Sequence, residues 1–452
     1  MDDVDVAIVG GGPAGSSAAR AAATADADTL VIEKGVPRAD REGLGPDSTD
    51  AAGMLDYWLD VMDEDPEVFP DNVILSELEG AEFMGPNETV ELTDTGIDAT
   101  YDEFGFSFHR ANFDDWLRDR AERAGATYQV GTSVSEVETD LEEGSHTLTL
   151  ADGEQLRADK LILADGPQRT VTTGALDQFM PDGESVSAYL SPDEANHIAY
   201  QEHRRVPAEL FDPDYIKFWW GVIPGHTAYP WIFPNDDGVA RIGLTMPIGV
   251  DLDEVDDREA YALLCEDDEQ VPAGAVYIRR LLEREFPAYD LEAFPLVEDR
   301  GKQNGTEAYP ISSTRPVESP VGADVAVAGG AMGITSAFHE GGDHVAVRTG
   351  KVAGRLAARD QLHRYNREWQ DAVGPEVLRN VTFAELVRGW GPGDWDSAFS
   401  AAAEMQGWGG FEWGSALRAG WTALKAVAAY KWLKRGFADG EYVQLREDDY
   451  AV

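Results

Sequence analysis

The chain has 452 residues, enough for two or three domains with a large hydrophobic core. Its formal net charge is −49, from 85 acidic and 36 basic residues, which argues against double-stranded nucleic acid as a partner. Cys265 is the single cysteine, so internal disulfides, C-x-x-C pairs and thiolate metal clusters are excluded, and we predict no metal site. No apolar run is long enough to span a membrane, and Asp2, Asp3 and Asp5 stand where a signal peptide carries basic residues. We therefore expect a cytoplasmic protein.

The first 35 residues predict a dinucleotide-binding β-α-β unit. Apolar residues 5–9 run into a glycine-rich loop that matches G-x-G-x-x-G and continues into an alanine-rich helix. The glycines permit the tight turn, the close approach of a pyrophosphate, and close helix packing. The helix N-terminus offers free N–H groups and a partial positive charge to phosphates. A second strand, 29–32, ends at an acid expected to accept a ribose hydroxyl. The predicted cofactor contacts are Gly10, Gly12, Pro13, Ala14, Gly15, Glu33 and Lys34.

The next 130 residues predict further strands and a helix. A short helix is expected near 54–61, and the alternation of apolar and polar residues over 73–108 predicts strands. Residues 112–124 have helical spacing. Residues 147–163 predict a β-hairpin followed by a buried strand that ends at Asp165 and Gly166.

The pattern changes beyond residue 170. From 171 to 300, strand-like segments rich in aromatic residues predict an antiparallel sheet that holds substrate. Residues 324–329 return to a buried strand that enters a glycine-rich loop, and a helix is expected over 343–356. The remaining C-terminal residues favour helix.

Together these segments resemble the flavoprotein superfamily that includes p-hydroxybenzoate hydroxylase, the flavin-dependent halogenases and the geranylgeranyl reductases. Residues 109–117, HRANFDDWL, are similar to the R-x-x-F-D-x-x-L segment beside FAD, and residues 164–166 are similar to the second strand-end motif. Residues 329–333, GGAMG, occupy the place of the G-D-A-A-G loop. The resemblance implies FAD, with further contacts from Arg110, Asp165, Gly166, Gly330 and Gly333.

The implied fold is α/β. It comprises a Rossmann-like FAD-binding domain (1–170 and 301–360), an inserted antiparallel-sheet substrate domain (171–300) and a helical C-terminal region (361–452). One segment, 229–234 or YPWIFP, resembles the Y-x-W-x-F-P motif of the geranylgeranyl reductases, which faces the flavin. Gly341 and Gly342 match that branch's loop near the isoalloxazine ring. The implied activity is reduction of isoprenoid double bonds in a prenylated lipid, an archaeal ether-lipid precursor or a quinone side chain.

Tyr229, Trp231 and Phe233 are then the predicted substrate contacts, since aromatic faces stabilise positive charge on a tertiary carbon. His339, in the same loop as the glycines, is the predicted proton donor, because the pKa of histidine lies near neutrality. The alternative for the three aromatic residues is an ordinary strand that fills a core. The alternative for His339 is a histidine that is merely hydrogen-bonded in its loop.

The chain also departs from the resemblance. Gly330 replaces the usual Asp that contacts the ribityl chain, and His339 and Glu340 stand where small residues are usual. Two alternatives therefore stay open. One is a monooxygenase or halogenase that uses O₂, and the other is a catalytically altered paralogue that binds FAD or no flavin. No separate NAD(P) fingerprint occurs, so the electron donor is left open.

The composition and the last segment carry two further expectations. In molar salt the Debye length is about 3 Å, and the mutual repulsion of so many acidic residues is largely screened. An excess of acidic residues of this size resembles that of haloarchaeal proteins. Residues 413–438 contain five basic residues and no acid. They predict a basic amphipathic helix that either lies peripherally on the inner membrane face or packs on the protein body. Its expected apolar stripe is Leu417, Trp421, Leu424 and Ala428.

Overall fold

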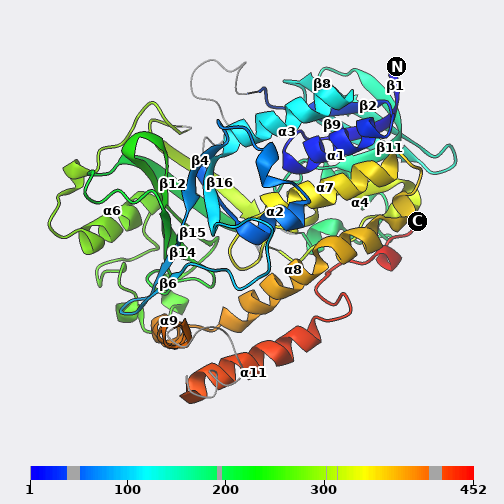
Figure 1. Cartoon of the computed structure of the whole chain (residues 1–452). Coiled ribbons are helices and arrows are strands. Elements are labelled where there is room, and N and C mark those ends of the chain that lie inside the picture. The colour runs from blue at the N-terminus through cyan, green and yellow to red at the C-terminus, as the bar shows by residue number, and fades with distance from the viewer. Residues whose placement is uncertain (1, 38–50, 191–195, 302, 313, 407–419) are drawn as a thin grey trace.

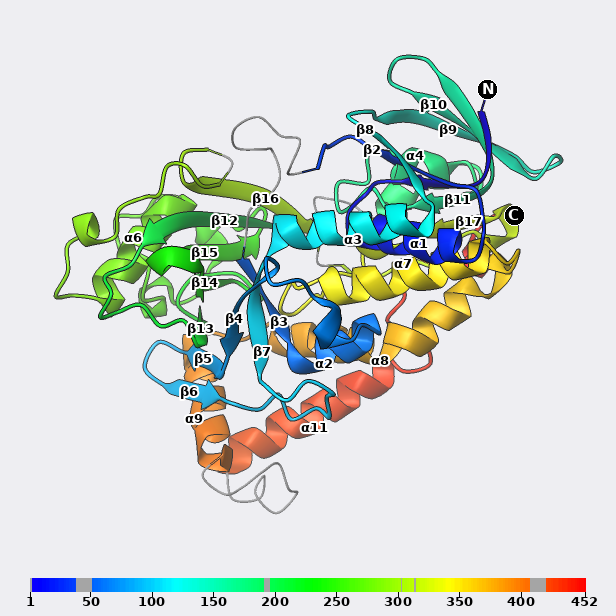
Figure 2. The ribbon, with the colours of Figure 1, turned by 45° about the horizontal axis from the view of Figure 1, so that its top comes forward.

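The structure is a computed structural model that describes residues 2–37, 51–190, 196–301, 303–312, 314–406 and 420–452. Two large sheets lie side by side, and the longest helices run along one edge of the molecule (Figures 1 and 2). The α/β fold class predicted from the sequence is confirmed. The helices of four turns or fewer are α1 (Pro13–Thr24), α2 (Asp56–Met62), α4 (Thr172–Asp177) and α6 (Gly274–Glu285). The longer helices are α3 (Arg110–Ala124), α7 (Asp343–Ala357), α8 (Tyr365–Val387), α9 (Pro392–Gln406) and α11 (Gly420–Gly436).

The first sheet is built around parallel strands in the order β8-β2-β1-β11, with β17 also paired to β11 and an antiparallel extension through β10 to β9. Helices α1, α3 and α7 lie against it (Figure 1). Burial on both faces explains why the inner strands β1 and β11 end in apolar runs, at residues 6–9 and 161–163. The strands are β1 (Asp2–Val9), β2 (Thr29–Glu33), β8 (Thr127–Val130), β9 (Val134–Asp140), β10 (Ser145–Leu150), β11 (Gln155–Leu163) and β17 (Val325–Val327).

Parallel pairing brings the loops after these strands to one edge of the sheet. Val9 pairs with Ile32 of β2 and with Leu163 of β11, and Leu163 pairs with Val327 of β17. The three glycine-rich or acidic motifs that follow these strands are far apart in sequence. They nevertheless meet at the carboxyl ends of the strands, where α/β sheets bind ligands.

Helices α1 and α7 approach each other unusually closely. A Cβ atom at Gly350 would lie 2.0 Å from the carbonyl oxygen of Ala14, and one at Gly354 would lie 2.0 Å from that of Ala18. Two glycines spaced by one helical turn therefore let the backbones touch. This contact fixes the N-terminus of α1, and with it the first glycine loop.

The second sheet has the order β16-β12-β15-β14-β13-β5-β6 and is antiparallel except for β13 beside β5. Helix α6 lies on one of its faces (Figure 2). Three of its seven strands, β5, β6 and β16, come from outside residues 171–300, and the predicted domain limits stay a prediction. The strands are β5 (Gly80–Met84), β6 (Thr89–Leu92), β12 (Asn196–Arg205), β13 (Tyr215–Trp219), β14 (Tyr229–Pro234), β15 (Val239–Pro247) and β16 (Thr306–Ser312).

A three-stranded sheet, β3-β7-β4, joins the two large ones. The C-terminal region is helical as predicted through α8, α9 and α11, and α11 lies along α8 (Figure 2). The chain then returns to the first sheet, where Leu445 bridges to Val317 and Tyr450 is buried in the first core. The small sheet consists of β3 (Ala51–Leu55), β4 (Ile74–Leu78) and β7 (Gly105–His109).

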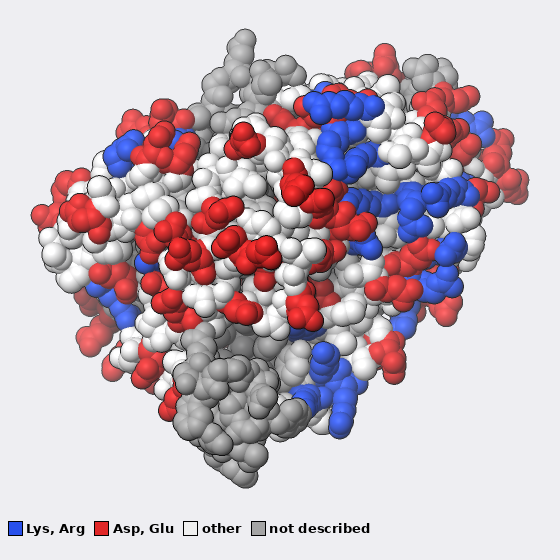
Figure 3. Space-filling view, viewed as in Figure 1, with Lys and Arg blue, Asp and Glu red and all other residues white. Residues whose placement is uncertain are grey.

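The surface carries the charge that the composition predicts. Acidic side chains are scattered over the whole visible face, and basic ones gather in a band over α1, α3 and α7 (Figure 3). Many of the basic groups are paired within this band, as in the ion pairs of Arg20, Arg120 and Lys351 with the buried carboxylate of Glu64. Among the described residues, no helix is both long and apolar enough to cross a membrane.

Candidate active site

A single continuous cavity of about 1020 Å³ connects the first sheet to the second. At one end its walls are the loops after β1, β2 and β11, and at the other they are aromatic side chains of the second sheet and α9. Gly15 and Gly333 are the two predicted site residues that do not line it. The predicted residues that do are Gly10, Gly12, Pro13, Ala14, Glu33, Lys34, Arg110, Asp165, Gly166, Tyr229, Trp231, Phe233, Gly330, His339, Gly341 and Gly342.

The three glycines of the first loop have different structural roles. Gly10 has φ of +98°, and a Cβ there would lie 2.3 Å from the carbonyl oxygen of Ala164. A Cβ at Gly15 would lie 1.8 Å from the carbonyl oxygen of Gly10. A Cβ at Gly12 would meet no atom within 4 Å, because this residue faces the open cavity. Gly10 and Gly15 thus shape the turn, and Gly12 leaves the space that a pyrophosphate needs at the helix N-terminus.

Glu33 secures the loop from the end of β2. Its two carboxylate oxygens accept hydrogen bonds from the N–H groups of Gly11 and Gly35, each at 2.6 Å. The side chain lines the cavity beside the loop, in the place where an acid meets a ribose in dinucleotide folds. Glu33 therefore stabilises the loop, in addition to its predicted contact with the ligand.

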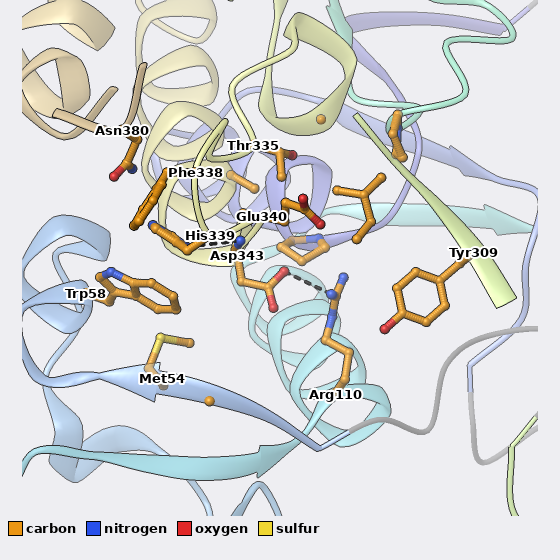
Figure 4. Close-up of a pocket in the computed structure, with 18 of the residues that line it drawn as sticks. Met54, Trp58, Arg110, Tyr309, Thr335, Phe338, His339, Glu340, Asp343 and Asn380 are labelled. Carbon is orange, nitrogen blue, oxygen red and sulfur yellow. Dashed lines mark hydrogen bonds and ion pairs between the residues drawn. The ribbon is translucent and has the colours of Figure 1, made fainter. Parts of the chain in front are cut away.

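Arg110 enters the cavity from the start of α3. Its guanidinium forms ion pairs with Asp114, at 2.9 Å, and with Asp343 at the start of α7, at 3.0 Å (Figure 4). Asp343 was not singled out by the sequence. The pair ties α3 to α7 across the middle of the cavity, between the glycine loops and the aromatic walls.

The carboxylate of Asp165 is largely occupied by hydrogen bonds within the protein. Its carboxylate accepts hydrogen bonds from the N–H of Val171 at 2.7 Å and from the hydroxyl of Thr172 at 2.5 Å, which caps α4. Capping of this kind stabilises the helix start by about 1 kcal/mol. The residue lines the cavity, so its position agrees with the prediction, while its carboxylate is engaged in holding the loop.

In the second glycine loop, a side chain could be accommodated at Gly330 but not at Gly333. A Cβ at Gly330 would lie 3.2 Å from Pro167, so a side chain fits there only after a small shift. Arg169 bonds to the carbonyl oxygens of Gly330 and Ala331 from behind the loop. Gly333 has φ of +80°, and a Cβ there would collide with Thr314, so we assign Gly333 to the turn itself.

The described residues fit a dinucleotide cofactor. The cradle is open where a pyrophosphate approaches, its walls are backbone rather than bulky side chains, and the cavity continues beyond it. The absent acid at position 330 removes one polar contact and leaves the space for the cofactor unchanged.

The far end of the cavity is aromatic. Tyr229, Trp231 and Phe233 alternate along β14, and all three line the cavity. Trp231 lies over Gly243 of β15, where a Cβ would sit 2.5 Å from the indole ring. Tyr229 stacks on Trp220 with ring centroids 4.4 Å apart, and its hydroxyl donates to the carbonyl oxygen of His339 at 2.7 Å. That bond joins the second sheet to the glycine loop.

Sequence reasoning missed most of the aromatic wall. These residues come from four segments that share no motif, and their common feature is apolar character at strand or helix spacing, which any core residue shows. Phe218 and Trp220 belong to the aromatic segments that the sequence placed in the substrate-holding sheet without assigning them to the site, and the missed members include Phe83, Phe338, Trp395 and Phe399.

His339 stands in a buried polar network rather than free in the cavity. Its Nδ1 accepts from the N–H of Gly341 at 3.2 Å, and its Nε2 lies 3.8 Å from Oε1 of Glu376 on α8. Figure 4 shows the ring in the cavity wall beside Trp58. The ring also stacks on Trp58, with centroids 5.1 Å apart. Burial lowers the pKa of His339, which favours the neutral ring.

Glu376 is the charged centre of this network. Burial alone would raise the pKa of its carboxyl, but His339, His344 and Arg379 hold that pKa well below its usual range. His344 lies 3.6 Å from the same oxygen and stacks on Trp58 with centroids 4.1 Å apart. The network therefore fixes the position of the His339 loop against α2 and α8.

The comparisons with known proteins agree with this site. The sequence profile described as tryptophan halogenase matches residues 43–208. A digeranylgeranylglycerophospholipid reductase of Methanosarcina acetivorans is 30% identical over 250 residues, which are 54% of this chain and 55% of that relative. Digeranylgeranylglycerophospholipid reductase 1 of Methanothermobacter thermautotrophicus is 25% identical over 436 residues, covering 90% of this chain and 92% of that one.

The fold has a solved counterpart of the same extent. The crystal structure of a geranylgeranyl bacteriochlorophyll reductase-like protein from Thermoplasma acidophilum matches with a TM-score of 0.69 and 22% identity. The match covers 97% of this chain and 99% of that one. The chain is thus similar over most of its length to a protein named digeranylgeranylglycerophospholipid reductase 1, and it shares the fold of a geranylgeranyl bacteriochlorophyll reductase-like protein.

Proposed function

We propose that the chain binds one FAD non-covalently and reduces isoprenoid C=C bonds of a prenylated lipid. The observation that carries the proposal is the single cavity, which runs from a glycine cradle for a dinucleotide into an aromatic compartment. A hydrophobic chain that enters the compartment would meet a cofactor seated in the cradle without crossing water. Two of the relatives are themselves named as reductases of a lipid with geranylgeranyl chains, which supports this substrate class.

The bound flavin would supply the hydride, and the protein supplies position and electrostatics. Gly10, Gly12 and the start of α1 would hold the pyrophosphate, with Glu33 near the ribose. Tyr229 and Trp231 present ring faces to a double bond, and such faces stabilise developing positive charge by about 2 kcal/mol in a dry site. The apolar wall also excludes water from the reacting carbons.

The test uses the full-length protein in molar salt. It is loaded with FAD, reduced with dithionite without O₂, and mixed with vesicles that contain a digeranylgeranyl glycerophospholipid. We expect mass spectrometry to show lipid heavier by two hydrogens for each reduced bond, and flavin absorbance to return in step. Lipid that stays unreduced while the flavin remains bound and reduced would contradict the proposal.

A halogenase or monooxygenase is the second candidate, because the tryptophan halogenase profile matches part of the chain. That chemistry would show as hydroxylated or halogenated product and as rapid flavin reoxidation by O₂ when an aromatic substrate is added. Residues 219–224, WWGVIP, are similar to the W-x-W-x-I-P motif of the halogenases, but Gly221 stands where the second Trp belongs. Gly221 has φ of +72°, and a Cβ there would lie 2.8 Å from Trp395, so the site has no room for that Trp. Its absence favours the reductase.

We also propose that the segment 413–438 docks the enzyme on a membrane surface. Leu417 lies outside the described residues, as do the side chains of Trp421 and Leu424. Within the described part of the segment, Trp432 on α11 is 73% exposed, although large apolar side chains are usually buried. In molar salt, burial of such side chains should outweigh attraction of the basic residues to lipid.

Liposome flotation in high salt tests the docking. Trp432→Asp should reduce the floated fraction severalfold. Ile248→Asp, which changes another exposed apolar side chain on a different element, should leave it unchanged. Equal flotation of the wild type and the Trp432 variant would show that α11 has no part in docking.

A further inference from the structure

One carboxyl group in the cavity wall has no part in the site as described so far. We propose that Glu340 donates the proton that completes reduction of the double bond, and that the exposed His226 restores this proton through the buried His197. The inference rests on the proposed reductase function. It replaces His339, the donor that the sequence suggested, with the next residue along the loop.

Glu340 lies where the two ends of the cavity meet. It follows His339 and precedes Gly341, so its backbone belongs to the glycine loop, while its side chain reaches strands β12 and β15 of the second sheet (Figure 4). Its φ is +59°, a left-handed conformation that a non-glycine residue adopts only when its surroundings enforce it. The surroundings include the hydroxyl of Thr245, which donates to Oε2.

The carboxyl is placed to hold a proton at neutral pH. Its side chain is 3% exposed, and burial raises the pKa of Glu340 well above the ordinary value. Within the described residues Oε1 accepts no hydrogen bond, and Nε2 of His197 lies 3.3 Å from it. A carboxyl with few stabilising partners in an apolar site stays neutral and can act as an acid.

The other groups around Glu340 do not offset this burial. From β14, Tyr229 faces it, and burial raises the pKa of that phenol as well. Tyr309 of β16 lines the same part of the cavity. Among the described residues, His197 is the basic side chain in contact with Glu340.

His339 is less suited to the role. Its Nδ1 is an acceptor for the N–H of Gly341, so the neutral ring carries its proton on Nε2. That nitrogen faces the ionised Glu376, 3.8 Å away on α8. A proton passed from Nε2 to a substrate would leave the stacking on Trp58 and the attraction to Glu376 unsupported.

Two histidines lie between Glu340 and solvent. Nε2 of His197 lies 3.3 Å from Oε1 of Glu340 and 3.0 Å from the hydroxyl of Thr227. The ring of His226 meets that of His197 edge to face, with centroids 5.7 Å apart, and His226 is exposed at the surface. Arg388 and Glu385, at the end of α8, are the charged groups that act on His226.

The step balances in electrons and atoms. One alkene carbon would receive a hydride, with two electrons, from a reduced flavin held in the cradle, and the O–H bond of Glu340 would break as its proton bonds to the other carbon. The double bond would then be reduced, the flavin oxidised, and Glu340 left as a carboxylate. His197 then delivers a proton taken from solvent at His226, and Glu340 returns to its starting form.

The first experiment needs no flavin. Infrared spectra of the apoprotein are recorded over roughly two pH units around neutrality, from about pH 6 to about pH 8. After the spectrum of Glu340→Gln at the same pH is subtracted, we expect a protonated carboxyl band that belongs to Glu340. Glu285→Gln is the matched control, because burial also raises the pKa of Glu285 but that residue lies outside the cavity wall. A Glu340 that is ionised throughout this range would overturn the proposal.

The second experiment measures one turnover of the pre-reduced enzyme on a digeranylgeranyl lipid. Glu340→Gln should lower the rate about 100-fold or more while flavin occupancy stays at the wild-type level. Glu285→Gln should retain the wild-type rate. His197→Gln should keep the wild-type rate in this single turnover and slow repeated turnover with excess dithionite, since it blocks only the return of the proton.

The outcomes separate the two proposals. If the wild type reduces no alkene, the proposed function fails. If the wild type reduces the lipid and Glu340→Gln is within threefold of its rate, the function stands and the assignment of Glu340 is wrong (threefold is about 0.7 kcal/mol).

Discussion

The two ends of the cavity are built by different means. At the cradle, the shape comes from backbone: Gly10 and Gly15 leave no room for a Cβ, and Gly12 leaves open space for a ligand. At the aromatic end, the shape comes from side chains such as Trp220, Tyr229 and Trp395, which stack on one another.

This difference has a practical consequence. A site made of backbone requires particular residues at fixed spacing, because only glycine fits the turn, and the requirement is written in one short segment. A site made of side chains needs only apolar volume from several segments, and many residues supply it. The cradle should therefore respond to small changes sharply, and the aromatic end gradually.

The largest effect is expected from Gly15→Val. The new Cβ would overlap the carbonyl oxygen of Gly10, so α1 cannot keep its place, and we expect a loss of about 4 kcal/mol or more of unfolding free energy. Gly12→Val is the matched variant, because its side chain enters open space. It should keep the stability of the apoprotein and lose bound FAD. Thermal unfolding and flavin absorbance measure the two effects, and full flavin occupancy in Gly12→Val would contradict the cradle.

Trp231→Leu probes the aromatic end. Truncation of a buried Trp leaves a cavity, and we expect a cost of roughly 2–4 kcal/mol together with weaker binding of the lipid chain. Trp219→Leu is its control, since Trp219 is equally buried but packs in the core on α6, outside the cavity. Both variants should lose stability, and only Trp231→Leu should raise the KM for lipid. An equal KM in both would remove Trp231 from the substrate site.

The stability of the first sheet should depend on pH through His146, which lies outside the cavity. Burial lowers the pKa of His146 in β10 to about 4, so the folded chain keeps the ring neutral while the unfolded chain protonates it near pH 6.5. The contribution of this neutral ring is complete above pH 6.5 and is lost as pH falls toward 4, by roughly 3 kcal/mol. Denaturant unfolding of His146→Gln in high salt should show a smaller fall over that range than the wild type. The exposed His363→Gln should match the wild type, and identical curves for all three would refute the assignment.

The smallest effect is expected from Gly330→Asp. The new side chain fits beside Pro167 after a shift of a few tenths of an ångström, and it restores a polar contact to the cofactor. We expect FAD to bind about tenfold more tightly, or 1.4 kcal/mol. Gly330→Ala tests the steric part alone. If FAD bound more weakly to Gly330→Asp than to Gly330→Ala, the loop would not have the arrangement that the resemblance implies.

The sequence predicted the framework well. The helices near 54–61 and 112–124, the hairpin at 147–163 and the strand before Gly329 are all found, because each has its periodicity and its turn residues within a short window. It did not predict that β5 pairs with β13 across more than 120 residues, with β6 added beyond β5. Such pairing leaves no local signal, since any apolar strand of suitable length can fill the place.

By itself, the sequence determined the dinucleotide loop, the acid at the end of β2 and the aromatic strand β14, because backbone geometry and strand alternation restrict the residues that each can hold. Only the tertiary structure decided the rest of the site. It set His339 in a buried network with Glu376, placed Glu340 against His197, and brought α9 to the end of the cavity. These facts depend on burial and on partners from distant segments, and burial is what decides whether a carboxyl group holds its proton.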